Sequence, residues 1–110
     1  MRQLVIDDLT REERDNIESY FRRNLQSGAL EGSYWLPLPV ELEGEAQSGH
    51  AACGPFFMGV ELGESRVAFE LLVRSHTNLH CSCISYATAV QRQYLLEVVD
   101  RMLVEEMISA

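Results

Sequence analysis

The sequence is poor in basic residues, and this shortage excludes one large class of partners. The chain of 110 residues carries 17 acidic and 9 basic side chains, which gives a net charge of −8 at neutral pH. Arg22-Arg23 is the only adjacent basic pair, so the basic residues form no patch along the chain. Because a negatively charged surface repels phosphate backbones, we expect no nucleic-acid partner.

Long apolar runs, a signal peptide and an even set of cysteines are also missing. No apolar stretch is long enough to cross a bilayer, and residues 1–8 lack the apolar core of a secretory signal. The cysteines number three, and an odd count argues against a disulfide framework. The sequence therefore predicts a cytoplasmic protein with reduced thiols and without a membrane partner.

The motifs that mark common catalytic and nucleotide sites are absent. Gly63-Glu64-Ser65 predicts a turn, and the chain has neither a G-x-G-x-x-G pattern nor a Walker loop. His50 and Cys53 could form a nucleophile–base pair, but no orienting third group accompanies them. Glu70 and Arg74 favour a charge pair on the sheet over an acid–base couple. We therefore predict no catalytic residues and a protein that is not an enzyme.

What is present is the composition of an ordinary globular domain with a helix at each end. Apolar residues make up 46% and charged residues 24% of the chain, which is long enough for one core. Thr10 and Glu13 have capping-box spacing before an apolar stripe, which predicts a helix that ends at Gly28. Thr88 and Gln91 have the same spacing before a final helix.

Between the two helices, alternation of apolar and polar residues predicts four strands. The predicted strands cover residues 33–42, 56–62, 66–74 and 79–87. A loop rich in Gly, Ala and acidic residues, 43–55, separates the first two of them. The predicted fold class is α+β in the order α-β-β-β-β-α: a four-stranded antiparallel meander with the N- and C-terminal helices packed on one face. We expect residues 1–110 to form a single globular domain.

Apolar pairing sets the expected register of the two hairpins. We place Leu62 opposite Val67, because a slip by one residue would set a glutamate against this valine. A three-residue turn at 76–78 is expected to return the chain as the fourth strand. That register points Cys81 and Cys83 to the same face as the most apolar column of the sheet.

Thiols and imidazoles offer the sharpest chemical hypothesis, a tetrahedral zinc site. The candidate ligands are His50, Cys53, Cys81 and Cys83, with His80 or His76 as alternatives. On a flat strand the side chains of a Cys-x-Cys pair lie roughly 6.6 Å apart, whereas two sulfurs on one zinc lie about 4 Å apart. A bulge or converging side chains would be required. The alternative is that Cys81 and Cys83 are small core residues.

The sheet face without helices is the second candidate region. The residues expected on it as partner-binding side chains are Trp35, Phe57, Leu72, Ile84 and Tyr86. An aromatic, half-apolar face of this kind is typical of contact with a protein or a ligand. The alternative is that the loop 43–55 folds over this face.

These observations lead to a prediction of function with one alternative. We expect a small non-enzymatic binding or interaction domain, without a cofactor, that self-associates or binds a protein partner. The contact would use the open sheet face or the last helix, whose apolar arc is wider than one packed face needs. The alternative is a small zinc-binding protein with a Cys/His site.

Overall fold

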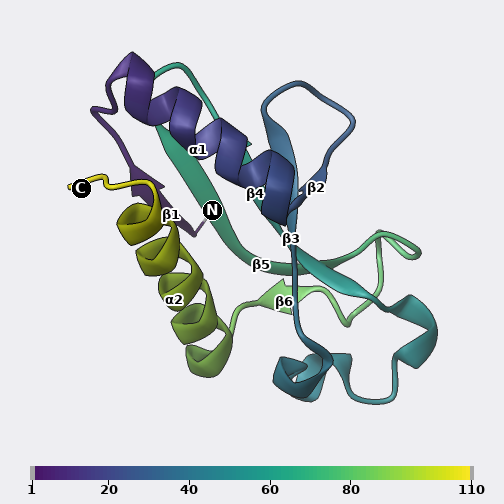
Figure 1. The fold of residues 1–110 in the computed structure, drawn as a ribbon. Helices are drawn as coiled ribbons and strands as arrows, with labels where there is room; N and C mark the ends of the chain where they lie inside the picture. Colours follow the sequence, from purple (N-terminus) through teal and green to yellow (C-terminus); the bar gives the residue numbers. More distant parts are fainter. Residues whose placement is uncertain (1, 110) are drawn as a thin grey trace.

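The computed structural model describes residues 2–109, in which an antiparallel sheet carries two helices on one face (Figure 1). In chain order, the helices and strands are β1 (Gln3–Ile6), α1 (Arg11–Asn24), β2 (Gln26–Ser27), β3 (Ser33–Pro37), β4 (Phe56–Leu62), β5 (Val67–Ser75), β6 (Ser85–Tyr86) and α2 (Ala89–Glu105). Single 3-10 turns between β3 and β4 cover Val40–Leu42, Glu45–Gln47 and Ala51–Cys53. The predicted α+β class, with a helix at each end of an antiparallel sheet, is confirmed. Over the described residues, neither helix combines the length and the apolar character needed to traverse a lipid bilayer.

The order of strands differs in part from a simple meander. The sheet runs β1-β5-β4-β3-β2, and β6 pairs with the later part of β5. β1 was not predicted; it pairs antiparallel with β5 and sets Leu4 opposite Phe69. The predicted first strand, 33–42, ends at Pro37, since prolines at 37 and 39 remove the backbone donors that a longer strand would need.

Both helices begin where their capping boxes predict. In each helix, the hydroxyl of the N-cap threonine (Thr10 or Thr88) accepts a hydrogen bond from the backbone N–H of the residue three positions later. The side chain of that residue, Glu13 or Gln91, accepts a hydrogen bond from the backbone N–H of the threonine. The end of α1 was predicted wrongly. The helix stops at Asn24, and Leu25 is already extended as the chain enters β2, so Gly28 does not end the helix.

The β4–β5 hairpin begins in the predicted register and then departs from it. Leu62 lies opposite Val67, as predicted. Between Met58 and Val60 the pairing then shifts, because Gly59 alone faces three residues of β5, 70–72; β5 therefore bulges here, and Met58 lies opposite Val73. A glycine accommodates such a bulge because it has no side chain to fit against the neighbouring strand.

After β5 the chain does not make the predicted tight turn. It makes a longer excursion over residues 76–84 and returns only as the short strand β6, with Ser85 opposite Val73. Cys81 and Cys83 therefore lie in the excursion and not on a strand. Of the predicted fourth strand, 79–87, only Ser85–Tyr86 forms, as β6, and the predicted register of the two cysteines is wrong.

The side chain of Ser75 explains why the sheet stops at this point. Its Oγ accepts the backbone N–H of Thr77 at 3.3 Å and that of Asn78 at 3.2 Å. Bonds of this kind compete with the ladder of a strand, because they give the backbone donors a local partner. The excursion begins directly after this serine.

One apolar core joins the helices to the sheet. The ring of Phe21 in α1 lies 5.1 Å from that of Tyr34 and 6.1 Å from that of Phe69, centroid to centroid. Leu95 and Met102 of α2 belong to the same buried cluster. Both helices therefore pack on one face of the sheet, and within the described residues no helix covers the opposite face, called the open face below (Figure 1).

Candidate metal centre

The candidate ligands meet where two irregular segments touch at one end of the sheet. His50 and Cys53 flank the 3-10 turn at Ala51–Cys53, and Cys81 and Cys83 come from the excursion after β5. Their ligand atoms all lie within 4.8 Å of one another. The structure thus brings together the four residues that the sequence singled out. His76 and His80, the alternatives, are outside this group.

The sulfur of Cys81 is central to the group. It lies 3.2 Å from Nδ1 of His50 and 3.6 Å from the sulfur of Cys53. The backbone N–H of Cys83 donates to the same sulfur at 3.4 Å. In a tetrahedron with Zn–S bonds near 2.3 Å, neighbouring ligand atoms lie about 3.5 to 4 Å apart. The separations of 3.2 and 3.6 Å, in a group whose ligand atoms all lie within 4.8 Å of one another, are close to the spacing around a single tetrahedral ion.

The objection to a Cys-x-Cys pair was its geometry on a flat strand. Because Cys81 and Cys83 lie on an irregular segment, their side chains point toward a common centre instead of standing apart along a strand. Cys83 is also fully buried in the apolar core, whereas Cys81 is half-buried. Cys83 can therefore be both a core residue and a metal ligand, because it belongs to the apolar core and its sulfur also belongs to the ligand group.

Buried polar side chains hold the two segments in place. The buried polar residues of the described chain are Gln47, Ser75 and Gln91. Ser75 Oγ donates to the carbonyl of Cys53 at 2.6 Å, and Gln47 Nε2 donates to the carbonyl of Cys83 at 2.7 Å. Gln91 Nε2 donates to Gln47 Oε1 at 3.3 Å. Sequence reasoning missed these supporting residues, since a single Gln or Ser in a loop or at a strand end carries no signal of burial.

The three thiols differ strongly in acidity. The backbone N–H that Cys83 donates lowers the pKa of Cys81 to about 7. Burial raises the pKa of Cys83 to about 12, and a hydrogen bond with Cys81 raises the pKa of Cys53. A divalent cation would supply the positive charge that permits all three to ionise, so metal binding here must release protons.

Most of the predicted partner-binding residues lie on the open face. Trp35, Phe57, Leu72 and Tyr86 are outside the apolar core cluster; Phe57 is buried, whereas Tyr86 is 49% exposed. Ile84 packs against the core instead, so its predicted place on the open face is wrong. The cause is the excursion after β5, which delays the return of the chain until β6.

The loop 43–55 does not settle over the open face. Gln47, at its middle, bonds to Cys83 and Gln91, both buried residues. Figure 1 shows this segment at the end of the molecule where α2 begins. The loop therefore closes the end of the core; on the open face, His76 stacks on the buried Phe57, whereas Trp35 and Tyr86 keep contact with solvent.

Replacing Gln47 with leucine should lower the free energy of unfolding by about 3 kcal/mol. The change keeps the volume but leaves the buried carbonyl of Cys83 and the half-buried N–H of Gly44 without their partner, and such groups cost about 1–3 kcal/mol each when buried. Urea unfolding measures the loss. The matched control is Gln93→Leu on the exposed side of α2, which should stay within about 0.5 kcal/mol. Equal effects of the two changes would contradict a supporting role for Gln47.

No protein-family model, curated protein or solved structure matches this chain. What the structure offers is the candidate site itself, in which three thiols and one imidazole converge.

Proposed function

We propose that this chain is a zinc-binding protein in which His50, Cys53, Cys81 and Cys83 hold one zinc ion. The observation that carries this proposal is the convergence of their ligand atoms within 4.8 Å. Thiolate and imidazole ligands in a tetrahedral set favour zinc over calcium or magnesium, which prefer oxygen ligands. The chain supplies these ligands from two segments that are distant in sequence, which is typical of a site that ties a fold together.

The ion would have a structural role. A full set of four protein ligands leaves no open position for a water or a substrate, as a catalytic zinc requires. The ion would instead fasten the loop 43–55 to the excursion 76–84, two segments without strand pairing. A cytoplasmic location belongs to this proposal, because thiolate ligands must stay reduced to bind the metal.

A second proposed function, interaction with a protein partner, rests on the open face. Trp35, Leu72 and Tyr86 reach solvent on a sheet surface that no helix covers within residues 2–109. α2 offers another surface for self-association, since Val90 and Val104 are 61% and 79% exposed. Exposed apolar groups of this kind mark contact sites more often than they mark catalytic ones. In this proposal the protein is a non-enzymatic interaction domain whose fold the metal stabilises.

Native mass spectrometry of protein purified without chelator and under reducing conditions tests the zinc site. We expect a mass increase of one zinc ion per chain. Replacement by cobalt(II) should give the charge-transfer absorption of thiolate ligands and the visible bands of a tetrahedral ion. A reduced protein that binds no metal from excess zinc would contradict the proposal, and so would a cobalt spectrum typical of octahedral oxygen ligands. The same spectra report the mass of a dimer, if one forms.

A further inference from the structure

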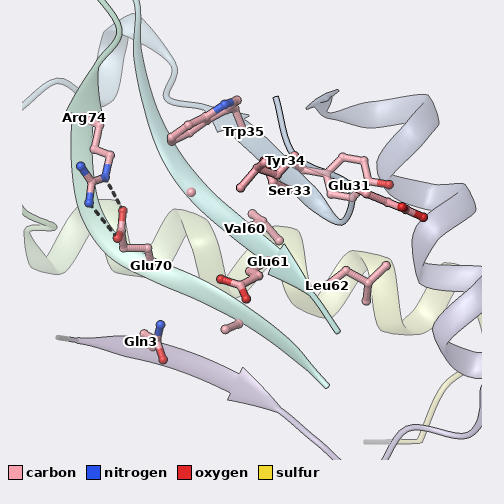
Figure 2. Close-up of a pocket in the computed structure, with 13 residues that line it drawn as sticks. Gln3, Glu31, Ser33, Tyr34, Trp35, Val60, Glu61, Leu62, Glu70 and Arg74 are labelled. Atoms are coloured by element: carbon pink, nitrogen blue, oxygen red, sulfur yellow. Dashed lines mark hydrogen bonds and ion pairs between the residues drawn. The ribbon is translucent and has the colours of Figure 1, made fainter. Parts of the chain in front are cut away.

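The open face contains a hollow of about 420 Å³ (Figure 2). Trp35 of β3 stands on one side of it, and the side chains of Glu70 and Arg74 of β5 stand on the other. Gly59 lies between them at the bulge. A Cβ at this position would come within 3.4 Å of both the Trp35 ring and the Glu70 carboxylate. A larger side chain at this position would therefore fill part of the hollow between the two walls.

Negative charge predominates in this hollow. Its lining contains the carboxylates of Glu31, Glu61 and Glu70 but only one cation, Arg74. That guanidinium is already engaged, since it donates to both carboxylate oxygens of Glu70 at 2.6 and 3.0 Å. The ion pairs within the described residues involve neither Glu31 nor Glu61, and Arg66, beside Glu61 in a neighbouring hollow, is not paired with it. Two carboxylates are thus left without a compensating charge.

Trp35 forms the aromatic wall of the hollow, and its ring is supported by His76 and Phe57. The ring of His76 stacks on Phe57 at 4.2 Å and meets Trp35 edge-on at 4.4 Å, centroid to centroid. Trp35 is therefore fixed in place while remaining partly exposed to solvent. A fixed indole beside carboxylates is suited to a cationic side chain, because the ring face attracts the charge and also packs against an aliphatic stem.

We propose that this hollow binds an arginine or lysine side chain from a basic segment of a protein partner. The aliphatic stem lies against Trp35 and the charged end faces Glu61. This inference rests on the interaction function proposed above and gives its partner class; the residues that line the hollow are separate from the four candidate metal ligands. The uncompensated charge of the hollow and the net charge of −8 of the whole chain both favour a cationic partner.

A second copy of the chain fits this surface poorly. In a twofold dimer through the open face, the same carboxylates of both subunits would meet across the interface. Like charges brought into such contact are destabilising. Self-association, in contrast, is compatible with α2, where exposed apolar side chains are available.

Binding of short peptides to the zinc-loaded protein tests the proposal. The probe is a fluorescein-labelled peptide of alternating glycine and lysine, with a glycine–glutamine peptide for comparison, measured by fluorescence anisotropy at low salt and at physiological salt. Glu61→Gln should weaken binding of the lysine peptide about fivefold, as expected for one exposed charge worth about 1 kcal/mol. The matched control is Glu64→Gln, an exposed residue outside the hollow, which should leave the affinity unchanged. Gly59→Val should abolish binding by filling the hollow without a change of charge.

Because the chain has no lysine, chemical cross-linking provides an independent readout of peptide binding. All nine basic residues are arginines, so the protein has no lysine amine. Carbodiimide coupling should therefore join its carboxylates to the amines of the peptide, and the cross-link should map to Glu61.

Distinct results would overturn the proposal. One is an equal loss of affinity for the lysine peptide in Glu61→Gln and Glu64→Gln, which would mean that the attraction is unspecific. Another is unchanged binding of this peptide by Gly59→Val. Equal binding of the glutamine peptide would also overturn it. Sedimentation measures the oligomeric state. A dimer that dissociates in the Glu61→Gln variant would identify the partner as a second copy of the chain. A dimer that depends only on α2, without peptide binding, would overturn the cationic partner but leave the interaction function intact.

Discussion

Replacing Cys81 with serine is expected to lower the zinc affinity by at least about a hundredfold. Structural zinc sites release about 10–16 kcal/mol through four ligands, so one ligand accounts for about 3 kcal/mol, or two orders of magnitude. Cys81 is the ligand with the most contacts in the group, and the serine hydroxyl that replaces its thiolate is a poor zinc ligand. Competition with a chromophoric chelator measures the affinity. The chain should remain folded when zinc is in excess, because Cys81 is only half-buried.

The histidines provide a matched control for this experiment. His50→Ala should weaken zinc binding as Cys81→Ser does, since Nδ1 of His50 lies 3.2 Å from the sulfur of Cys81. His80→Ala should not, although His80 directly precedes Cys81, because its side chain is exposed and outside the ligand group. If His80→Ala lost the metal and His50→Ala kept it, the assigned ligand set would be wrong.

The parts of the fold that could be predicted from sequence depend on local rules. The capping boxes at Thr10 and Thr88 set the starts of both helices. Each box involves only residues that are close in sequence, so it can be recognised without knowledge of the tertiary structure. The pairing of Leu62 with Val67 follows from a short turn between apolar runs. The edge strand β1 was missed because four residues give too short a pattern to separate from a tail.

The rest depended on contacts that one sequence does not reveal. The bulge of β5 opposite Gly59 changes the register at little cost, and no residue near it in the sequence predicts it. The side chain of Ser75 ends β5 by bonding both to the local backbone and to the distant carbonyl of Cys53. For the metal centre, the ligand types were evident from the sequence. Their convergence was not, because it requires Cys81 to leave the sheet.

The proposed metal centre lies where strand pairing is missing. Neither the loop 43–55 nor the excursion 76–84 forms a strand, and the hydrogen bonds between them include those from Gln47 to the carbonyl of Cys83 and from Thr77 to the carbonyl of Cys53. A zinc ion bound by both segments would replace that pairing with metal–ligand bonds. The same excursion begins with His76, which holds Trp35 on the open face. Order in the metal centre and order in the proposed binding surface are thus coupled through a short stretch of chain.

Removal of zinc by a strong chelator is therefore expected to lower the midpoint of thermal unfolding by about 15 °C. A ligand present at about a thousand times its dissociation constant adds about 4 kcal/mol of stability, and each kcal/mol shifts the midpoint by about 4 °C in a domain of this size. Hydrogen exchange should locate the loss of protection in residues 43–55 and 76–84, while β4 and β5 remain protected. Fluorescence of Trp35, the single tryptophan, should change as well, because His76 loses its fixed position. The same chelator added to Cys81→Ser should produce a much smaller shift, because this variant binds zinc about a hundredfold more weakly. An unchanged midpoint for the parent protein would show that the metal does not stabilise the fold.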